Sequence, residues 1–197
     1  MTQVFLNYRT VDEPYGAVML DQLLSDRFGS AAVFFASKSI PLGAEWEAEM
    51  FKAVGESDAL LVIMGPQWLT AADEHGNRRI DDPRDFVRRE ILTAFDLGKQ
   101  VIPVLLDARR VKPEELPEEL RRLCDLQDIK IHFRSARPDV DRLAMRLRQL
   151  IPGLRAAEKP NETAPAAKFV AKVESGVLNQ AETMHFDGDF YAGPKVG

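Results

Sequence analysis

The stretch Ala59-Leu60-Leu61-Val62-Ile63-Met64, followed by Gly65-Pro66, decides the fold class of this 197-residue chain. Six apolar residues in a row, without polar residues at alternate positions, are typical of a strand that is buried on both faces of its sheet. Gly and Pro directly after the run end the strand. Because both faces of such a strand need a cover of helices, the run indicates a parallel α/β sheet.

Similar short apolar runs lie on both sides of this segment and alternate with helical patterns. The expected strands are residues 4–6, 32–35, 59–64, 101–106 and 129–133. Apolar residues at helical spacing predict helices over 14–29, around 46–54, over 84–97 and over 140–150, with one short helix in the charged segment 107–127 and a loop over 36–43. This alternation predicts a flavodoxin-like sheet of five parallel strands with helices on both faces.

The chain divides unevenly along its length. Residues 1–152 contain the whole alternating pattern, and residues 153–167 have the composition of a linker. Residues 168–197 form a Gly-rich, β-prone tail that is too short to bury a core of its own. The sequence therefore predicts one domain, a linker and a short tail.

Composition excludes several classes of protein. Cys124 is the single cysteine, so a disulfide scaffold is excluded, and the spacing of the three histidines predicts no metal site. The net charge of −5, from 26 basic and 31 acidic residues, argues against nucleic acid as a partner. The absence of a signal sequence or long apolar run predicts no membrane association, and with the free thiol it favours the cytoplasm.

The loops that follow the strands carry none of the common motifs of nucleotide chemistry. In a sheet of this kind the functional crevice lies beyond the carboxyl ends of the strands. The chain has no GxGxxG, no GxxxxGK[ST] and no GxSxG, and the third strand ends in Gly65-Pro66 where a phospho-receiver needs an aspartate. These absences exclude dinucleotide oxidoreduction, P-loop hydrolysis, serine hydrolysis and phosphorelay.

Five segments, spread over residues 1–150, resemble boxes of the TIR domain (Toll/interleukin-1 receptor) family of bacteria. They are Val4-Phe5-Leu6-Asn7-Tyr8-Arg9 with Asp12, Val33-Phe34-Phe35 with Ser39-Ile40-Pro41-Leu42-Gly43 and Trp46, Ser57 to Leu69, Phe86-Val87-Arg88-Arg89-Glu90-Ile91, and Gly98 to Val104. Each segment by itself is unspecific, but the five occur in the order that the family has. Asn7 stands where many members have a serine.

The resemblance implies an activity, because many TIR domains are NAD+ glycohydrolases. Their catalytic glutamate lies in or beside the helix after the second strand, where this chain has Glu45, Glu47 and Glu49. Counting back from the third strand favours Glu47, next to Trp46, and Glu49 is the second choice. NAD+ is then the substrate, and neither cofactor nor metal is implied.

The same resemblance suggests further residues of the site. Trp46 is expected to form a wall of the site, Arg9 and Lys38 to lie near the phosphates, and Tyr8 or Phe35 near the bases. The three glutamates also suit the positive end of a helix dipole. Arg88, Arg89 and Glu90 are expected to form a solvated helix face.

The tail resembles the short amyloid-like signalling motifs of some bacterial defence proteins. Copies of such a segment stack in register, so the tail is expected to promote homo-oligomers through TIR–TIR contacts or to bind an upstream sensor protein; a disordered tail is the alternative. The function implied is an NAD+ glycohydrolase of antiviral defence or cell suicide, switched on by self-assembly. The alternative is a non-catalytic TIR adaptor, and the product, whether ADP-ribose, a cyclic isomer or the result of base exchange, stays open.

Overall fold

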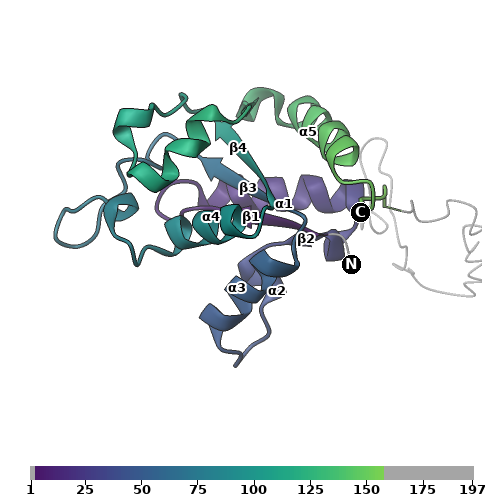
Figure 1. Ribbon diagram of the computed structural model, residues 1–197. Coiled ribbons are helices and arrows are strands. Elements are labelled where there is room, and N and C mark those ends of the chain that lie inside the picture. Colours follow the sequence, from purple (N-terminus) through teal and green to yellow (C-terminus); the bar gives the residue numbers. More distant parts are fainter. Residues whose placement is uncertain (1–2, 158–197) are drawn as a thin grey trace, which may run out of the picture. The chain divides into compact units, whose positions relative to one another are not determined.

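The computed structural model describes residues 3–157, in which helices cover both faces of a five-stranded parallel sheet (Figure 1). The strands are β1 (Val4–Asn7), β2 (Val33–Phe34), β3 (Ala59–Met64), β4 (Gln100–Leu106) and β5 (Ile129–Ile131). Their order in the sheet is β2-β1-β3-β4-β5, and every neighbouring pair is parallel. The flavodoxin-like sheet predicted from the sequence is confirmed.

Alternate residues of the central strand enter two separate cores, which explains why the whole run is apolar. Leu61 and Ile63 pack with α1 (Pro14–Phe28) and α5 (Ala136–Leu150) on one face of the sheet. Leu60, Val62 and Met64 pack with α3 (Trp46–Glu56) and α4 (Phe86–Asp96) on the other face. A strand with two covered faces has no position left for a polar side chain.

Two connecting segments and the starts of two helices differ from the sequence prediction. The expected loop 36–43 begins with a short helix, α2 (Ala36–Ser39), and the charged segment 107–127 forms two 3₁₀ helices, η3 (Pro113–Glu115) and η4 (Glu118–Asp125). Helix α4 begins at Phe86, because the Asp85 side chain accepts a hydrogen bond from the Arg88 backbone N–H and caps the helix. Helix α5 begins at Ala136, four residues before the expected start at Val140.

The loops after the two central strands are tied together. Asp12, in the loop after β1, accepts hydrogen bonds of 2.7 Å each from the backbone N–H groups of Gly65 and Gln67, directly after β3. A Cβ at Gly65 would lie 2.2 Å from Glu13 Cγ, so the close approach of the two loops requires glycine there. The strand order reverses between β1 and β3, and this is the place where α/β sheets bind ligands.

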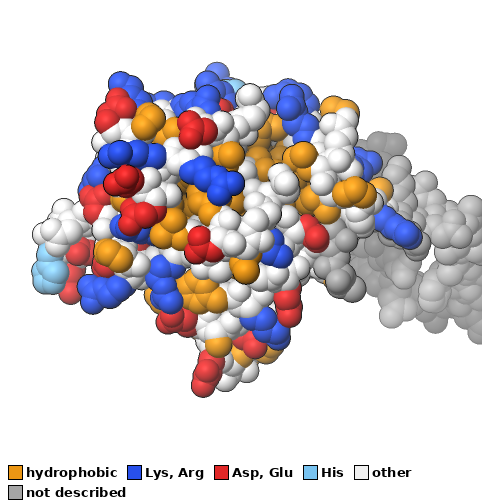
Figure 2. All heavy atoms as spheres, in the orientation of Figure 1, with side chains coloured by type: hydrophobic (Ala, Val, Ile, Leu, Met, Phe, Trp, Pro, Cys, Tyr) orange, Lys and Arg blue, Asp and Glu red, His pale blue; other side chains and the backbone are white. Residues whose placement is uncertain are grey.

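Charged side chains of both signs are interspersed on the face of the molecule seen in Figure 2. Among residues 3–157, no helix is long and apolar enough to cross a membrane. The predicted tail, residues 168–197, and most of the predicted linker lie outside the described residues.

Candidate active site

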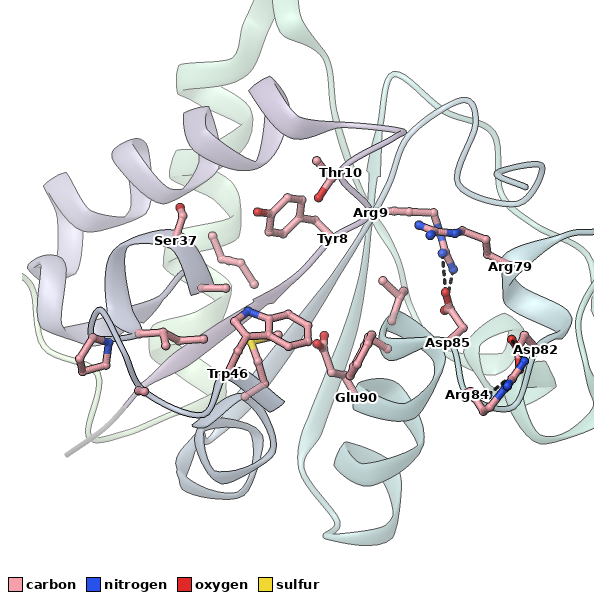
Figure 3. Close-up of a pocket in the computed structure, with 18 of the residues that line it drawn as sticks. Tyr8, Arg9, Thr10, Ser37, Trp46, Arg79, Asp82, Arg84, Asp85 and Glu90 are labelled. Carbon is pink, nitrogen blue, oxygen red and sulfur yellow. Dashed lines mark hydrogen bonds and ion pairs between the residues drawn. The ribbon is translucent and has the colours of Figure 1, made fainter. Parts of the chain in front are cut away.

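A cavity of about 740 Å³ opens beyond the carboxyl end of β1. Its walls come from the loop after β1, from the segment between α2 and α3, from the start of α4 and from residues before that helix (Figure 3). Polar and aromatic residues of the lining include Tyr8, Arg9, Ser37, Trp46, Arg79, Asp82, Arg84, Asp85, Phe86 and Glu90. The cavity lies at the edge of the sheet that the strand order predicts for a ligand.

An aromatic and charged cluster forms the rim of this cavity between α3 and α4. The Trp46 side chain is 44% exposed and meets the Phe86 ring edge to face, with 4.7 Å between ring centroids. The Arg89 guanidinium lies 4.5 Å from the centroid of Phe51 and 5.4 Å from that of Phe86. Arg89 Nη2 also donates to Glu47 Oε1 at 2.7 Å. Trp46 therefore lies in the wall of the cavity.

The favoured glutamates lie beside the cavity, and its lining includes none of them. Glu47 is 52% exposed and faces Arg89. Glu49 is 38% exposed and lies 3.6 Å from Lys52, one helical turn away. Glu45 is the exposed residue that precedes α3. Glu47 thus lies next to the rim, because it follows Trp46 directly in α3. Its carboxylate forms an ion pair with Arg89 of the neighbouring helix α4.

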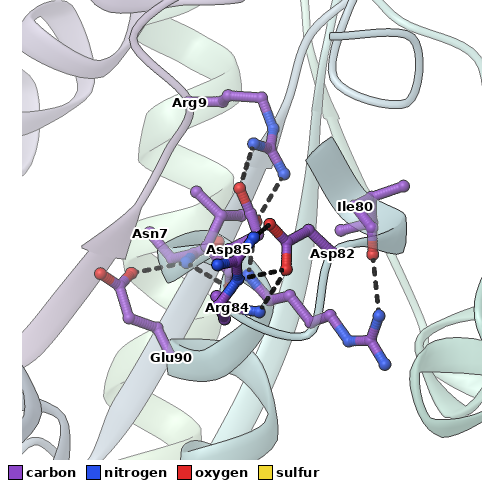
Figure 4. Close-up of polar contacts among 9 residues, drawn as sticks. Asn7, Arg9, Ile80, Asp82, Arg84, Asp85 and Glu90 are labelled. Atoms are coloured by element: carbon purple, nitrogen blue, oxygen red, sulfur yellow. Dashed lines mark hydrogen bonds and ion pairs between the residues drawn. The ribbon is translucent and has the colours of Figure 1, made fainter. Parts of the chain in front are cut away.

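The cations expected near the phosphates are engaged elsewhere. Arg9 lines the cavity, but its two Nη atoms donate to both oxygens of Asp85 at 2.7 and 2.9 Å, and both side chains are buried (Figure 4). Lys38 donates to Asp21 at 2.6 Å, on α1, and is absent from the cavity lining. Both residues hold segments of the chain together in this structure.

Two other arginines bring positive charge to the cavity. Arg84 lines it and donates to Asp82 at 3.3 Å. Arg79 also lines it, and its guanidinium forms no ion pair or hydrogen bond with any of residues 3–157. Figure 3 shows both arginines on the opposite side of the cavity from Trp46. No signal in the sequence marks these two residues, because Arg79 lies in a polar segment without periodicity and Arg84 was expected in the first turn of a helix.

The two aromatic residues expected near the bases lie one behind the other. Tyr8 lines the cavity and is half-buried, and burial raises the pKa of its hydroxyl. Phe35 packs against it with 5.2 Å between ring centroids, but it is buried and does not reach the cavity. Of this pair, Tyr8 is the residue that a ligand in the cavity meets.

Glu90 lies at the floor of the cavity, 3% exposed. Its Oε2 accepts a hydrogen bond of 2.7 Å from Asn7 Nδ2, which also donates to the Val87 carbonyl oxygen at 3.2 Å (Figure 4). Burial raises the pKa of the Glu90 carboxyl from 4.5 to about 8, and the nearby Asp85 adds to this effect. The hydrogen bond from Asn7 and the charges of Arg9 and Arg89 lower the pKa of Glu90, but by less than burial raises it. At neutral pH Glu90 therefore carries a proton.

The expectation of a solvated face at residues 88–90 is wrong for Arg88 and Glu90. Arg88 is 6% exposed and donates to the carbonyl oxygens of Ile80 and Asp81. Val87 and Ile91 point into the core, and Glu90 follows Val87 by three positions, so it shares their face. That spacing was the signal in the sequence that identifies Glu90 as a buried residue.

The chain is similar to one protein family and to several solved structures. The family model that matches, over residues 4–144, is that of the TIR domain. The solved TIR domains of the activated Roq1 resistosome, which directly recognises the pathogen effector XopQ, are 14% identical, with a TM-score of 0.49 over 76% of this chain and 99% of that one. A metazoan TIR-STING receptor from C. gigas, in complex with 2',3'-cGAMP, is 19% identical, with a TM-score of 0.47 over 72% of this chain and 38% of that one.

No curated protein matches the chain. The family model nevertheless spans most of the sequence, from the first residue of β1 into α5. Its match includes all five strands and every residue named above as lining the cavity. The chain therefore belongs to the TIR domain family.

Proposed function

We propose that this TIR domain is an NAD+ glycohydrolase that cleaves the bond between nicotinamide and ribose. The observation that carries the proposal is the cavity itself, which combines the Trp46 indole, the guanidiniums of Arg79 and Arg84 and the buried carboxyl of Glu90. An indole face suits a cationic pyridinium ring, and guanidiniums suit a diphosphate. The TIR family, which includes NAD-cleaving enzymes, supports the same activity.

The chemistry requires little of the protein. Nicotinamide leaves as a neutral molecule with the electron pair of the glycosidic bond, and the ribose carbon passes through a transition state that resembles an oxocarbenium ion. Water then adds to this carbon, and its proton goes to solvent. Because the leaving group is already cationic, no general acid is needed, and a single carboxylate beside the developing charge supplies electrostatic stabilisation.

Glu47 is the carboxylate we propose for this role, and Glu49 is the second choice. Glu90 is neutral at physiological pH, Asp85 is held by the buried Arg9, and Asp82 lies on the side of the cavity away from Trp46. Glu47 is charged and solvated, and it follows Trp46 directly. To act, its carboxylate has to exchange Arg89 for the hydroxyls of the ribose, which requires a rotation of the side chain.

A measurement of nicotinamide release from NAD+ by concentrated protein tests the proposal. We expect release by the wild type, a loss of at least about tenfold in E47Q, and wild-type rates in E56Q, an exposed glutamate at the other end of the same helix. Release that survives E47Q but is lost in E49Q would move the role to the second choice. No release from folded, concentrated protein would favour the non-catalytic adaptor.

We further propose that activity increases when copies of the domain assemble. Leu42, in the segment that covers the cavity between α2 and α3, is fully exposed, and Trp46 and Phe86 beside it are partly exposed. Apolar side chains at a cavity rim favour contact with a second copy, which would also exclude water from the site. Self-assembly would then switch on NAD+ consumption in response to a signal in defence or cell suicide. The tail, residues 168–197, would promote this clustering.

A further inference from the structure

Glu90 forms a polar floor at the end of the cavity where Trp46 forms the wall (Figure 3), and Asn7 supports it with a hydrogen bond of 2.7 Å. The figure shows the Glu90 carboxyl on the side of Trp46, away from Arg79 and Arg84. The diphosphate and the positively charged ring of a dinucleotide therefore have separate places in one cavity. The Glu90 carboxyl has no role in the reaction proposed above.

The hydrogen bonds of Asn7 fix the orientation of the Glu90 carboxyl. Both N–H bonds of the Asn7 amide are used, one by the Val87 carbonyl oxygen and one by Glu90 Oε2. Glu90 Oε1 forms no hydrogen bond with any of residues 3–157, and Figure 4 shows it directed away from Asn7. Since Glu90 lines the cavity, Oε1 is the atom that a ligand meets there.

Among residues 3–157, the two cations close to this carboxyl are already paired with other carboxylates. Arg9 is held by both oxygens of Asp85, and Arg89 is held by Glu47. The other titratable groups that face Glu90 are Asp85, which opposes a negative charge on it, and Tyr8, which is uncharged. The proton that Glu90 keeps lies on Oε1 when Oε2 accepts from Asn7, so the floor presents an O–H donor to the cavity.

We propose that Glu90, positioned by Asn7, recognises the carboxamide of the nicotinamide ring through an acid–amide pair. The Glu90 O–H donates to the carboxamide oxygen, and a carboxamide N–H donates to Oε2, which keeps one lone pair free. A ring that bears a carboxylate in place of the carboxamide has no N–H to donate. Its charge would also be buried in the surroundings that keep Glu90 neutral. The floor therefore selects nicotinamide nucleotides over their nicotinate counterparts.

This inference rests on the proposed function for its substrate, so its test measures binding as well as cleavage. Calorimetry with nicotinamide and nicotinate, on wild type, E90Q and E90M, needs no catalysis. Wild type is expected to prefer nicotinamide over nicotinate roughly tenfold at about pH 6, and to bind nicotinamide several-fold more weakly at about pH 10, where Glu90 is ionised and has no O–H to donate. E90Q keeps a donor and an acceptor that do not titrate, so its affinity for nicotinamide should be the same at both values of pH.

E90M keeps the size of the side chain but has neither group, and we expect it to bind both pyridines alike. Near-ultraviolet circular dichroism checks that E90M is folded. If E90M does not fold, the pH dependence of nicotinamide binding by wild type, compared with that of E90Q, still tests the proposal. Equal binding of the two pyridines by wild type, a preference that E90M retains, or no binding of either pyridine would overturn the inference. Selective binding of nicotinamide without any cleavage of NAD+ would instead contradict the proposed function, while the role of Glu90 in recognising the carboxamide would stand.

Discussion

Glu90 Oε2 lies 2.7 Å from Asn7 Nδ2, although the two residues are 83 positions apart in the chain. The hydrogen bond joins the last residue of β1 to the middle of α4. The Glu90 carboxyl is buried, and it forms no ion pair with any of residues 3–157. A buried and neutral glutamate makes stability depend on pH, because the unfolded chain loses this proton far more readily.

The free energy of unfolding should fall as the pH rises from about 4.5 to about 8, because Glu90 keeps its proton in the folded state and loses it in the unfolded state. Below this window both states are protonated, and the contribution is fully present; above it, both are ionised. The loss is on the order of 5 kcal/mol at most. Urea unfolding of wild type and E90Q at the two ends of the window measures it, since E90Q cannot titrate. Parallel pH profiles for the two proteins would contradict a neutral Glu90.

Substitution of Arg9 should destabilise the domain strongly, because Asp85 would be left as a buried charge without its partner. The exposed fractions of the two side chains are 2% and 9%. We expect R9M to cost about 3–5 kcal/mol of unfolding free energy. The double variant R9M/D85N should recover part of this loss, because asparagine removes the charge and still caps α4. Equal stability of the single and double variants would show that the charge of Asp85 is solvated without Arg9.

Release of Glu47 from Arg89 should increase the proposed activity. R89M removes the cation but keeps an apolar side chain against Phe51 and Phe86. We expect kcat/KM for nicotinamide release to rise severalfold, because Glu47 then turns to the ribose without breaking an ion pair. R122M is the matched control, since Arg122 stacks on Phe95 at 4.7 Å in another part of the domain. A fall in activity in R89M alone would mean that Arg89 orients Glu47 in place of restraining it.

Deletion of residues 168–197 should remove the dependence of assembly on protein concentration. The deletion leaves intact the residues that the family model matches, 4–144. Sedimentation of full-length and shortened chains over a range of concentrations measures the effect, and nicotinamide release by the same samples shows whether assembly and activity change together. Identical sedimentation of the two chains would mean that the tail plays no part in clustering.

The sequence determined the architecture because the signals of secondary structure are local. Six buried positions in β3, the apolar spacing of the helices and the glycine after α4 are all visible within a window of a few residues. The same information predicted a functional crevice at the carboxyl ends of the strands, where the cavity lies, whereas the role expected for Trp46 came from the resemblance to TIR domains. Without the resemblance to TIR domains, these patterns would have given the sheet and its functional edge but no reaction.

The tertiary structure alone decided the partners and the charge of the polar side chains. Lys38 and Arg9 were both expected near phosphates, yet their nearest carboxylates belong to α1 and to the start of α4. The charge state of Glu90 depends on its burial and on Asn7, which the order of the strands brings to it from another part of the chain. Desolvation and ion pairing act through space, so no pattern of neighbouring residues records them.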